Sequence, residues 1–366
     1  MKKLFFLIIS VVFIISCTSD PRYTVEGELE GIDEGKVYLQ KRRSDQFIKI
    51  DSASIEGGTF QINGGSVDYP DAYYLNVEGK GGYLVFFLEN TKLNVNGHAD
   101  SLFNAVVEGS FTQDEYDEYN NGLDPLYERN ITLFNEIRNA RQQGDTLKLP
   151  ELEAERNLLF EEITEYNLVY VRSHPASYVA PHVLNSETYD ISVEEIESFV
   201  ELLDPKLLGT EIIIDLKDRI EKLKKVAIGK MAPDFTLNDT LGNPVSLSDV
   251  VGPELLLVDF WAAWCDPCRQ ENPNVVAVYN EFHDKGFDVL GVSLDRDKDD
   301  WLKAIEEDSL VWTQVSDLQY WQNKAAQLYA VTAIPANFLL DSEGKIIATN
   351  VRGPELRRTV AEKLGE

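Results

Sequence analysis

The sequence predicts a small β domain, a helical spacer and a C-terminal α/β domain. Three observations predict this arrangement. Apolar and polar residues alternate with the period of a β-strand as far as residue 111, and they follow helical spacing over 112–226. From residue 229 onward, short apolar runs alternate with helical segments, which is typical of an α/β sheet with helices on its faces. A chain of 366 residues has room for two or three domains.

Residues 1–17 have the features of an export signal. Two lysines precede an apolar run from Leu4 to Ile15, which is shorter than the about 20 residues that span a bilayer. The run leads into Ile-Ile-Ser-Cys, which resembles the lipobox of bacterial lipoproteins, whose signal is cut before a cysteine that carries lipid. The resemblance implies a lipid on Cys17 that anchors the protein to a bacterial membrane, facing the periplasm of the cell envelope. An ordinary signal peptide and an uncleaved anchor are the alternatives.

Residues 22–111 are expected to form the β domain. Short alternating runs are separated by Gly and Asn, and the fuller apolar run over 83–90 suits a central strand. We predict a small antiparallel, sandwich-like domain without catalytic residues. Residues 112–226 are expected to form a helical linker region between the two ends of the chain.

The charge of the chain restricts its partners. It has 34 basic and 63 acidic residues, for a formal net charge of −29. An acidic surface repels phosphate backbones and anionic headgroups, so we expect no nucleic-acid partner and membrane attachment only through the lipid.

Two cysteines, Cys265 and Cys268, lie where an apolar strand ends and a helix is expected to begin. A four-cysteine zinc site needs two such pairs, and haem attachment needs a histidine where Arg269 stands. We therefore expect no metal and no cofactor. A structural cross-link is the alternative to redox chemistry, but the position at a helix N-terminus favours a reactive thiolate.

The two cysteines are expected to have different roles. Cys265, at the start of the helix, should be the exposed thiolate that attacks a partner disulfide. Cys268, one turn further, should be the buried thiol that resolves the mixed disulfide.

Three segments carry a resemblance to a known family. Residues 231–252, 258–273 and 328–353 resemble the TlpA/ResA-like thiol–disulfide oxidoreductases of the thioredoxin superfamily. The resemblance covers residues 229–366 and implies a thioredoxin-like domain with protein-disulfide reductase activity. It also implies protein disulfides as substrates, with apocytochrome c as one candidate, and an upstream thiol electron donor. The preceding part of the chain resembles only loosely the front half of some thioredoxin-like lipoproteins.

The resemblance also implies a substrate-binding surface. Pro335 matches the cis-proline of the family, which lies against the disulfide and helps to hold an extended substrate. Trp264 matches the aromatic residue that shields the thiolate, and Ile334 joins these two residues as an expected substrate-binding position.

Two carboxylates are further candidates for catalysis. Asp259 matches the buried aspartate of thioredoxin, which takes the proton of the resolving thiol and whose pKa burial should raise. Glu271 matches a glutamate used by the ResA branch. Gly291 stands near the position of the lysine that partners the aspartate in thioredoxin, so the full proton network of thioredoxin is not expected here.

Two other functions compete with a disulfide reductase. Peroxiredoxins share this kind of sheet, but the proline and hydroxyl residues that orient peroxide are replaced here by Val258 and Ala262. A binding or scaffolding lipoprotein with an accessory redox domain is the second alternative, because most of the chain lies outside residues 229–366.

Overall fold

The computed structural model describes residues 22–43, 46–145, 147–188 and 191–366. The expected signal segment 1–17, including Cys17, lies outside the described residues. The chain divides into two compact units within the long helix α1 (Phe111–Gln143), between Asp124 and Pro125.

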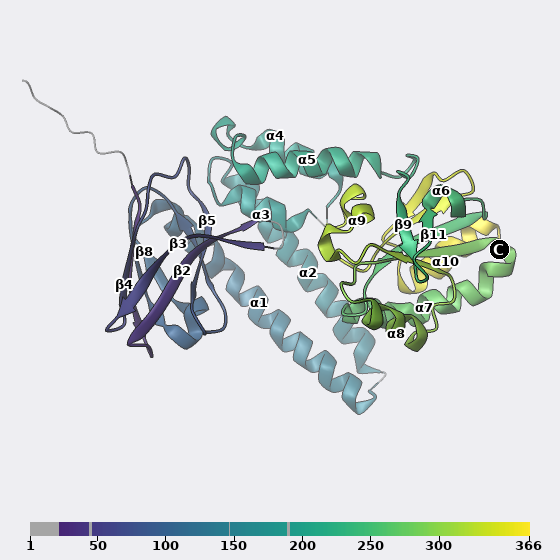
Figure 1. Ribbon diagram of the computed structural model, residues 1–366, viewed down its shortest axis with the longest axis horizontal. Helices are drawn as coiled ribbons and strands as arrows, with labels where there is room; N and C mark the ends of the chain where they lie inside the picture. Colours follow the sequence, from purple (N-terminus) through teal and green to yellow (C-terminus); the bar gives the residue numbers. More distant parts are fainter. Residues whose placement is uncertain (1–21, 44–45, 146, 189–190) are drawn as a thin grey trace, which may run out of the picture. The chain divides into compact units, whose positions relative to one another are not determined.

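The N-terminal unit contains eight strands that form one hydrogen-bonded order, β6-β5-β2-β3-β4-β1-β7-β8 (Figure 1). In β5 every second residue is buried, as expected for a strand with one face on a core. The strands are β1 (Thr24–Glu30), β2 (Glu34–Arg43), β3 (Gln46–Glu56), β4 (Thr59–Asn63), β5 (Asp71–Val77), β6 (Leu84–Leu88), β7 (Lys92–His98) and β8 (Val106–Glu108).

The eight strands fall into two groups of four. The groups are joined through the β3–β4 hairpin, whose ladder is the pair Glu56–Thr59. Residues from both groups, such as Leu39 on β2 and Val95 on β7, share one core and are fully buried. The sheet therefore folds over itself, which confirms the β-rich, sandwich-like prediction.

One strand pair departs from the antiparallel expectation. β1 and β7 run parallel, from the pair Thr24–Lys92 to the pair Glu30–His98. Five strands separate them along the chain, which is ample for the long connection that a parallel pair requires. Alternation of apolar residues identifies a strand but not its direction, so the sequence pattern did not predict this pair.

Helices follow the β domain. Arg129 on α1 forms ion pairs with Glu155 and Glu162 on the next helix.

Among the described residues, no helix has the length and apolar character needed to cross a membrane. The helices after α1 are α2 (Lys148–Ser173), α3 (Ala180–Glu187), α4 (Val193–Leu202) and α5 (Glu211–Lys225).

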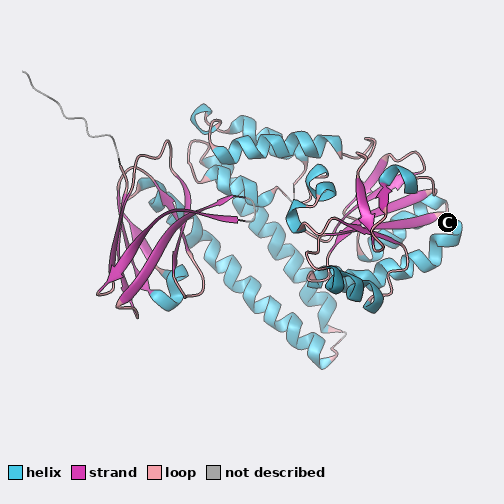
Figure 2. Cartoon of the chain, in the orientation of Figure 1, coloured by secondary structure: helices cyan, strands magenta, loops and turns pink. Residues whose placement is uncertain are grey.

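The C-terminal domain is built on a seven-stranded sheet of order β10-β9-β13-β12-β11-β14-β15, with helices on its faces (Figure 2). This arrangement confirms the expected α/β fold. The strands are β9 (Thr236–Asp239), β10 (Pro244–Ser246), β11 (Leu255–Trp261), β12 (Phe287–Ser293), β13 (Thr313–Ser316), β14 (Ala336–Asp341) and β15 (Ile346–Thr349). The helices are α6 (Leu247–Val250), α7 (Asp266–Phe282), α8 (Lys298–Glu307), α9 (Lys324–Leu328) and α10 (Gly353–Leu364).

The central strand β11 positions the cysteine pair. It runs parallel to β12 and antiparallel to β14, and all seven of its residues are buried. The chain leaves β11 at Trp261 and enters α7 at Asp266, so the segment between them lies at one end of the central strand. A rigid strand and a helix therefore fix the position of Cys265 from both sides.

Candidate active site

Cys265 and Cys268 form a disulfide at the beginning of α7. Cys265 is the N-cap residue of the helix, and its Sγ atom accepts a hydrogen bond from the backbone N–H of Cys268 at 3.2 Å. Pro267 lies in the first turn, where backbone N–H groups have no partner within the helix, and proline suits this position because it has no N–H group. A donor at the helix N-terminus aimed at Sγ stabilises a thiolate in the reduced protein.

Cys265 is less accessible than the sequence suggested. Its exposed fraction is 4%, against 1% for Cys268. The prediction of an exposed Cys265 is therefore wrong for the disulfide form. The Sγ atom lies against the helix backbone on one side and is 3.7 Å from the carbonyl oxygen of Ile334 on the other.

The loop before β14 forms one border of the disulfide. The Ile334–Pro335 peptide bond is cis, as the family resemblance implied. The side chain of Arg352 donates a hydrogen bond from Nη2 to the carbonyl oxygen of Pro335. The structure thus brings Ile334 and Pro335 next to Cys265.

The turn between β11 and α7 is held by a carboxylate that the sequence analysis did not single out. Asp295 accepts the backbone N–H of Ala263 at 3.1 Å and the hydroxyl of Ser293 at 2.7 Å. Burial raises the pKa of Asp295, although both hydrogen bonds oppose the increase. An Asp two residues after the apolar strand β12 was the sequence signal that could have identified it.

Asp259 lies on the buried strand β11, and its exposed fraction is 6%. Burial raises its pKa from 3.8 to about 7; the negative charge of Glu271 adds to the increase and the positive charge of Arg352 opposes it. The group can therefore take up and release a proton near neutral pH. This is the property that the sequence analysis expected of a proton acceptor for Cys268.

Gly291 lies opposite Asp259 in the β11–β12 register. A Cβ atom at Gly291 would lie 2.1 Å from Oε1 of Gln314, which accepts a hydrogen bond from the indole of Trp261 at 3.0 Å. The side chain of Gln314 thus occupies the space that a lysine at this position would need. This packing explains why the lysine of the thioredoxin proton network has no counterpart at position 291.

Glu271 and Arg352 lie near Asp259 from two different elements. Glu271 Oε1 accepts hydrogen bonds from the backbone N–H of Gly353 at 2.8 Å and from Asn274 at 2.7 Å. This ties α7 to the start of α10. Arg352 precedes α10 and was missed by the sequence analysis, because about 90 residues separate it from Asp259 along the chain.

Arg269, the cation that directly follows Cys268, is paired with two carboxylates. Arg269 Nε lies 2.5 Å from Asp308, and its Nη2 atom lies 2.9 Å from Glu307. The hydrogen bond with Asp308 raises the pKa of Arg269 above its ordinary value. The guanidinium is thus engaged at the end of α8, and its charge is compensated there.

Trp264 borders the disulfide on the side of the β11–α7 turn. Its side chain is 43% exposed, and its Nε1 atom donates a hydrogen bond to the carbonyl oxygen of Leu294 at 3.4 Å. Trp264 directly precedes Cys265, and Ile334 and Pro335 lie on the opposite loop, so these three residues lie close to the cysteine pair; their role in holding a substrate stays a prediction.

Two regions of the chain match known protein families. Residues 228–349 match the AhpC/TSA family, and residues 23–116 match a domain of unknown function (DUF4369).

The thiol-disulfide oxidoreductase ResA of Geobacillus thermodenitrificans is 34% identical over 121 residues, which cover 33% of this chain and 67% of the relative. ResA of Bacillus thuringiensis is 28% identical over 143 residues, 39% of this chain and 80% of the relative. The thioredoxin domain of a thiol-disulfide oxidoreductase from Bacteroides vulgatus is 44% identical, with 38% of this chain and 98% of that chain covered and a TM-score of 0.36.

Proposed function

Because the chain belongs to the ResA-like thiol–disulfide oxidoreductases of the thioredoxin superfamily, we propose that it is a reductant of protein disulfides in the bacterial cell envelope. The observation that carries this direction is the negative charge near the cysteine pair. Asp266 is exposed in the first turn of α7, and Glu271 lies five residues further along the helix. Arg352 supplies a positive charge on the Pro335 side, but Arg269 is compensated by two carboxylates. Negative charge disfavours the thiolate, so the disulfide form is favoured and the dithiol gives up its electrons.

The reaction takes place in two exchanges. The thiolate of Cys265 attacks one sulfur of a substrate disulfide, forms a mixed disulfide and releases the other substrate sulfur as a thiolate. Cys268 then transfers its proton to Asp259 and attacks Sγ of Cys265. The mixed disulfide breaks, the substrate leaves fully reduced, and Cys265 and Cys268 hold the two-electron oxidised state. An upstream dithiol donor reduces the pair again.

Equilibration of the cysteine pair against glutathione buffers tests the direction. We expect a potential nearer to the about −270 mV of thioredoxin than to the about −120 mV of a strong oxidant of this fold. A potential above about −180 mV, in the region of disulfide isomerases, would overturn the direction while leaving the redox activity intact.

The substrate can be identified by trapping. In Cys268→Ala the mixed disulfide with Cys265 has no resolving thiol, so captured partners remain attached and can be identified by mass spectrometry. We propose protein disulfides in general, with the haem-site cysteines of apocytochrome c as one candidate. Cys265→Ala is the matched control, because it lacks the thiolate that attacks.

Attachment to the membrane is proposed through lipid on Cys17. The lipobox-like sequence before this residue supports the proposal. Metabolic labelling with a radioactive fatty acid is expected to label the wild type and not Cys17→Ser. Equal labelling of the two proteins would contradict a lipid anchor on this residue.

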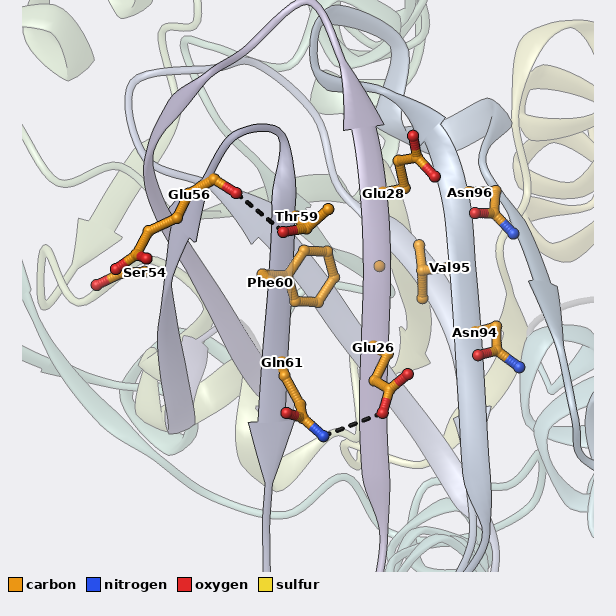
Figure 3. Close-up of a pocket in the computed structure, with 11 residues that line it drawn as sticks. Glu26, Glu28, Ser54, Glu56, Thr59, Phe60, Gln61, Asn94, Val95 and Asn96 are labelled. Carbon is orange, nitrogen blue, oxygen red and sulfur yellow. Dashed lines mark hydrogen bonds between the residues drawn. The ribbon is translucent and has the colours of Figure 1, made fainter.

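A second candidate function, partner binding, comes from the β domain. A pocket lies on β1, β4 and β7, and its lining residues include Glu26, Phe60, Gln61 and Asn94 (Figure 3). This feature favours the binding or scaffolding alternative for the front part of the chain. The alternative would be supported if the function of the protein in the cell is lost when the β domain is deleted but is kept in a variant in which Cys265 and Cys268 are both replaced.

A further inference from the structure

Three aromatic side chains form a cluster beside the disulfide. Trp264 comes from the turn before α7, and Tyr320 and Trp321 come from a short 3-10 helix between β13 and α9. The ring centroids of Trp264 lie 5.0 Å from Tyr320 and 5.8 Å from Trp321, and the last two are 5.8 Å apart. We call these three residues the aromatic cluster.

The tryptophans of the chain divide by burial. Of the five, Trp261, Trp301 and Trp312 are buried, with exposed fractions of 1%, 2% and 6%. The other two, Trp264 and Trp321, are not buried, and they contact each other next to Cys265. Large apolar rings that stay accessible beside a reactive group are typical of a surface that binds a partner.

The segment that carries Tyr320 and Trp321 is held in place by its own hydrogen bonds. Asp317 accepts bonds from the Asn323 side chain at 2.9 Å and from the Lys324 backbone at 3.0 Å. Leu318 and Tyr320 have φ values of 57° and 56°, in the left-handed region that bulky residues rarely occupy. Such a conformation persists where the surroundings impose it, so the cluster is formed before a substrate arrives.

A cation extends the cluster. The guanidinium carbon of Arg296 lies 3.9 Å from the ring centroid of Tyr320, which is cation–π geometry. Arg296 therefore covers part of the Tyr320 ring. Trp264, the residue that directly precedes Cys265, is the most exposed member of the cluster.

We propose that the aromatic cluster selects protein disulfides in which an aromatic side chain lies next to the attacked cysteine. The proposal rests on the disulfide-exchange function given above. An extended peptide whose sulfur reaches Cys265 lies next to the Ile334–Pro335 loop and next to Trp264, which directly precedes the attacking cysteine. Its neighbouring side chain then meets Trp264, Tyr320 and Trp321, and an aromatic ring gains edge and face contacts that an aliphatic or glycine residue cannot make.

The test compares two synthetic peptides with the prereduced full-length protein. Each peptide has one cysteine in a mixed disulfide with thionitrobenzoate, followed by Phe in one peptide and Gly in the other. Attack of Cys265 on the peptide sulfur forms the protein–peptide disulfide and releases the coloured thiolate, so stopped-flow absorbance gives a second-order rate constant. The measured quantity is the ratio of the rate constants for the Phe and Gly peptides.

We expect the wild type to prefer the Phe peptide and the double variant Tyr320→Ala/Trp321→Ala to lose about tenfold in this ratio. The single variant Trp321→Ala should lose part of it, and Tyr320→Phe, which keeps the ring, should retain it. Phe103→Ala removes a 64% exposed aromatic residue from the β domain and should leave the ratio unchanged.

The outcomes separate the two proposals. Equal rates for both peptides in the wild type, or an unchanged ratio in the double variant and in Trp321→Ala, would overturn selection by the cluster. If the wild type reacts with neither peptide, the disulfide-exchange function fails, and this proposal fails with it. A fall of the ratio in Phe103→Ala would also contradict the assignment to the cluster.

Discussion

The two cores of the chain hold buried carboxylates in different ways. In the β domain, Asp71 is buried and its Oδ2 atom lies 2.6 Å from the Lys41 ammonium, so its charge is balanced. In the C-terminal domain, burial raises the pKa of both Asp259 and Asp295. The first arrangement pairs a buried carboxylate with a cation, whereas the second makes protonation easier near the cysteine pair. The comparison indicates that the chemistry of the chain is concentrated in the C-terminal domain.

The largest expected effect follows from removal of the attacking sulfur. Cys265→Ala should abolish reduction of a protein disulfide, because no other thiolate occupies the N-cap of α7. The measurement is the rate of disulfide reduction with a chemical dithiol as electron donor. Residual activity well above the uncatalysed exchange would show that Cys265 is not the nucleophile.

Asp259→Asn is expected to slow resolution of the mixed disulfide by about 100-fold, because a proton acceptor typically contributes that much or more. Single-turnover kinetics would measure this step, which in the wild type should accelerate as pH rises through about 7, where Asp259 loses its proton. Asp71→Asn, the matched control in the β domain, should leave the rate unchanged. A pH profile that is the same in Asp259→Asn and the wild type would contradict the role of Asp259.

The same substitution has a consequence for stability. The folded protein keeps a proton on Asp259 up to pH about 7, whereas the unfolded chain loses it near its ordinary pKa of 3.8. Stability of the wild type therefore falls as pH rises between these values, by up to about 4 kcal/mol. Asp259→Asn should be the more stable protein at alkaline pH and lose this advantage at acidic pH. Denaturant unfolding can be followed by tryptophan fluorescence, because all five tryptophans lie in the C-terminal domain.

The sequence predicted the α/β character of the C-terminal domain, because its strands and helices each carry their own pattern of apolar residues. The apolar run of β11 and the cysteine spacing placed the pair at a strand–helix junction, which the structure confirms. The contribution of Arg352 could not be predicted in this way, because it depends on the packing of the α10 start against the Pro335 loop. The low exposure of Cys265 and the parallel β1–β7 pair also depend on tertiary contacts rather than on local pattern.

A smaller effect is expected from Arg352→Met. The positive charge of Arg352 lowers the pKa of Asp259, and its side chain donates to the Pro335 carbonyl. Its removal should move the pH midpoint of the resolving step upward and slow that step severalfold at neutral pH, and Arg352→Lys should restore part of the midpoint. Arg357→Met, which removes an exposed cation of α10 paired with Glu281, is the matched control. An unchanged midpoint in Arg352→Met would contradict the electrostatic role.

The smallest expected effect tests whether the charges around the cysteine pair set the direction of electron flow. Asp266 follows Cys265 directly and is exposed in the first turn of α7, where its carboxylate repels the Cys265 thiolate. Asp266→Asn removes this repulsion, so the reduced form becomes more stable and the potential should rise, by about 10 mV for an exposed charge at a helix N-terminus. The thiol pKa of Cys265, which we expect to lie above neutral in the wild type, should fall at the same time. Asp299→Asn removes another exposed carboxylate, from the first turn of α8, and should leave both quantities unchanged. Equilibration with glutathione and the pH dependence of iodoacetamide labelling measure the potential and the pKa. A lower potential in Asp266→Asn, or equal shifts in the two variants, would show that this charge does not contribute to the reducing character of the pair.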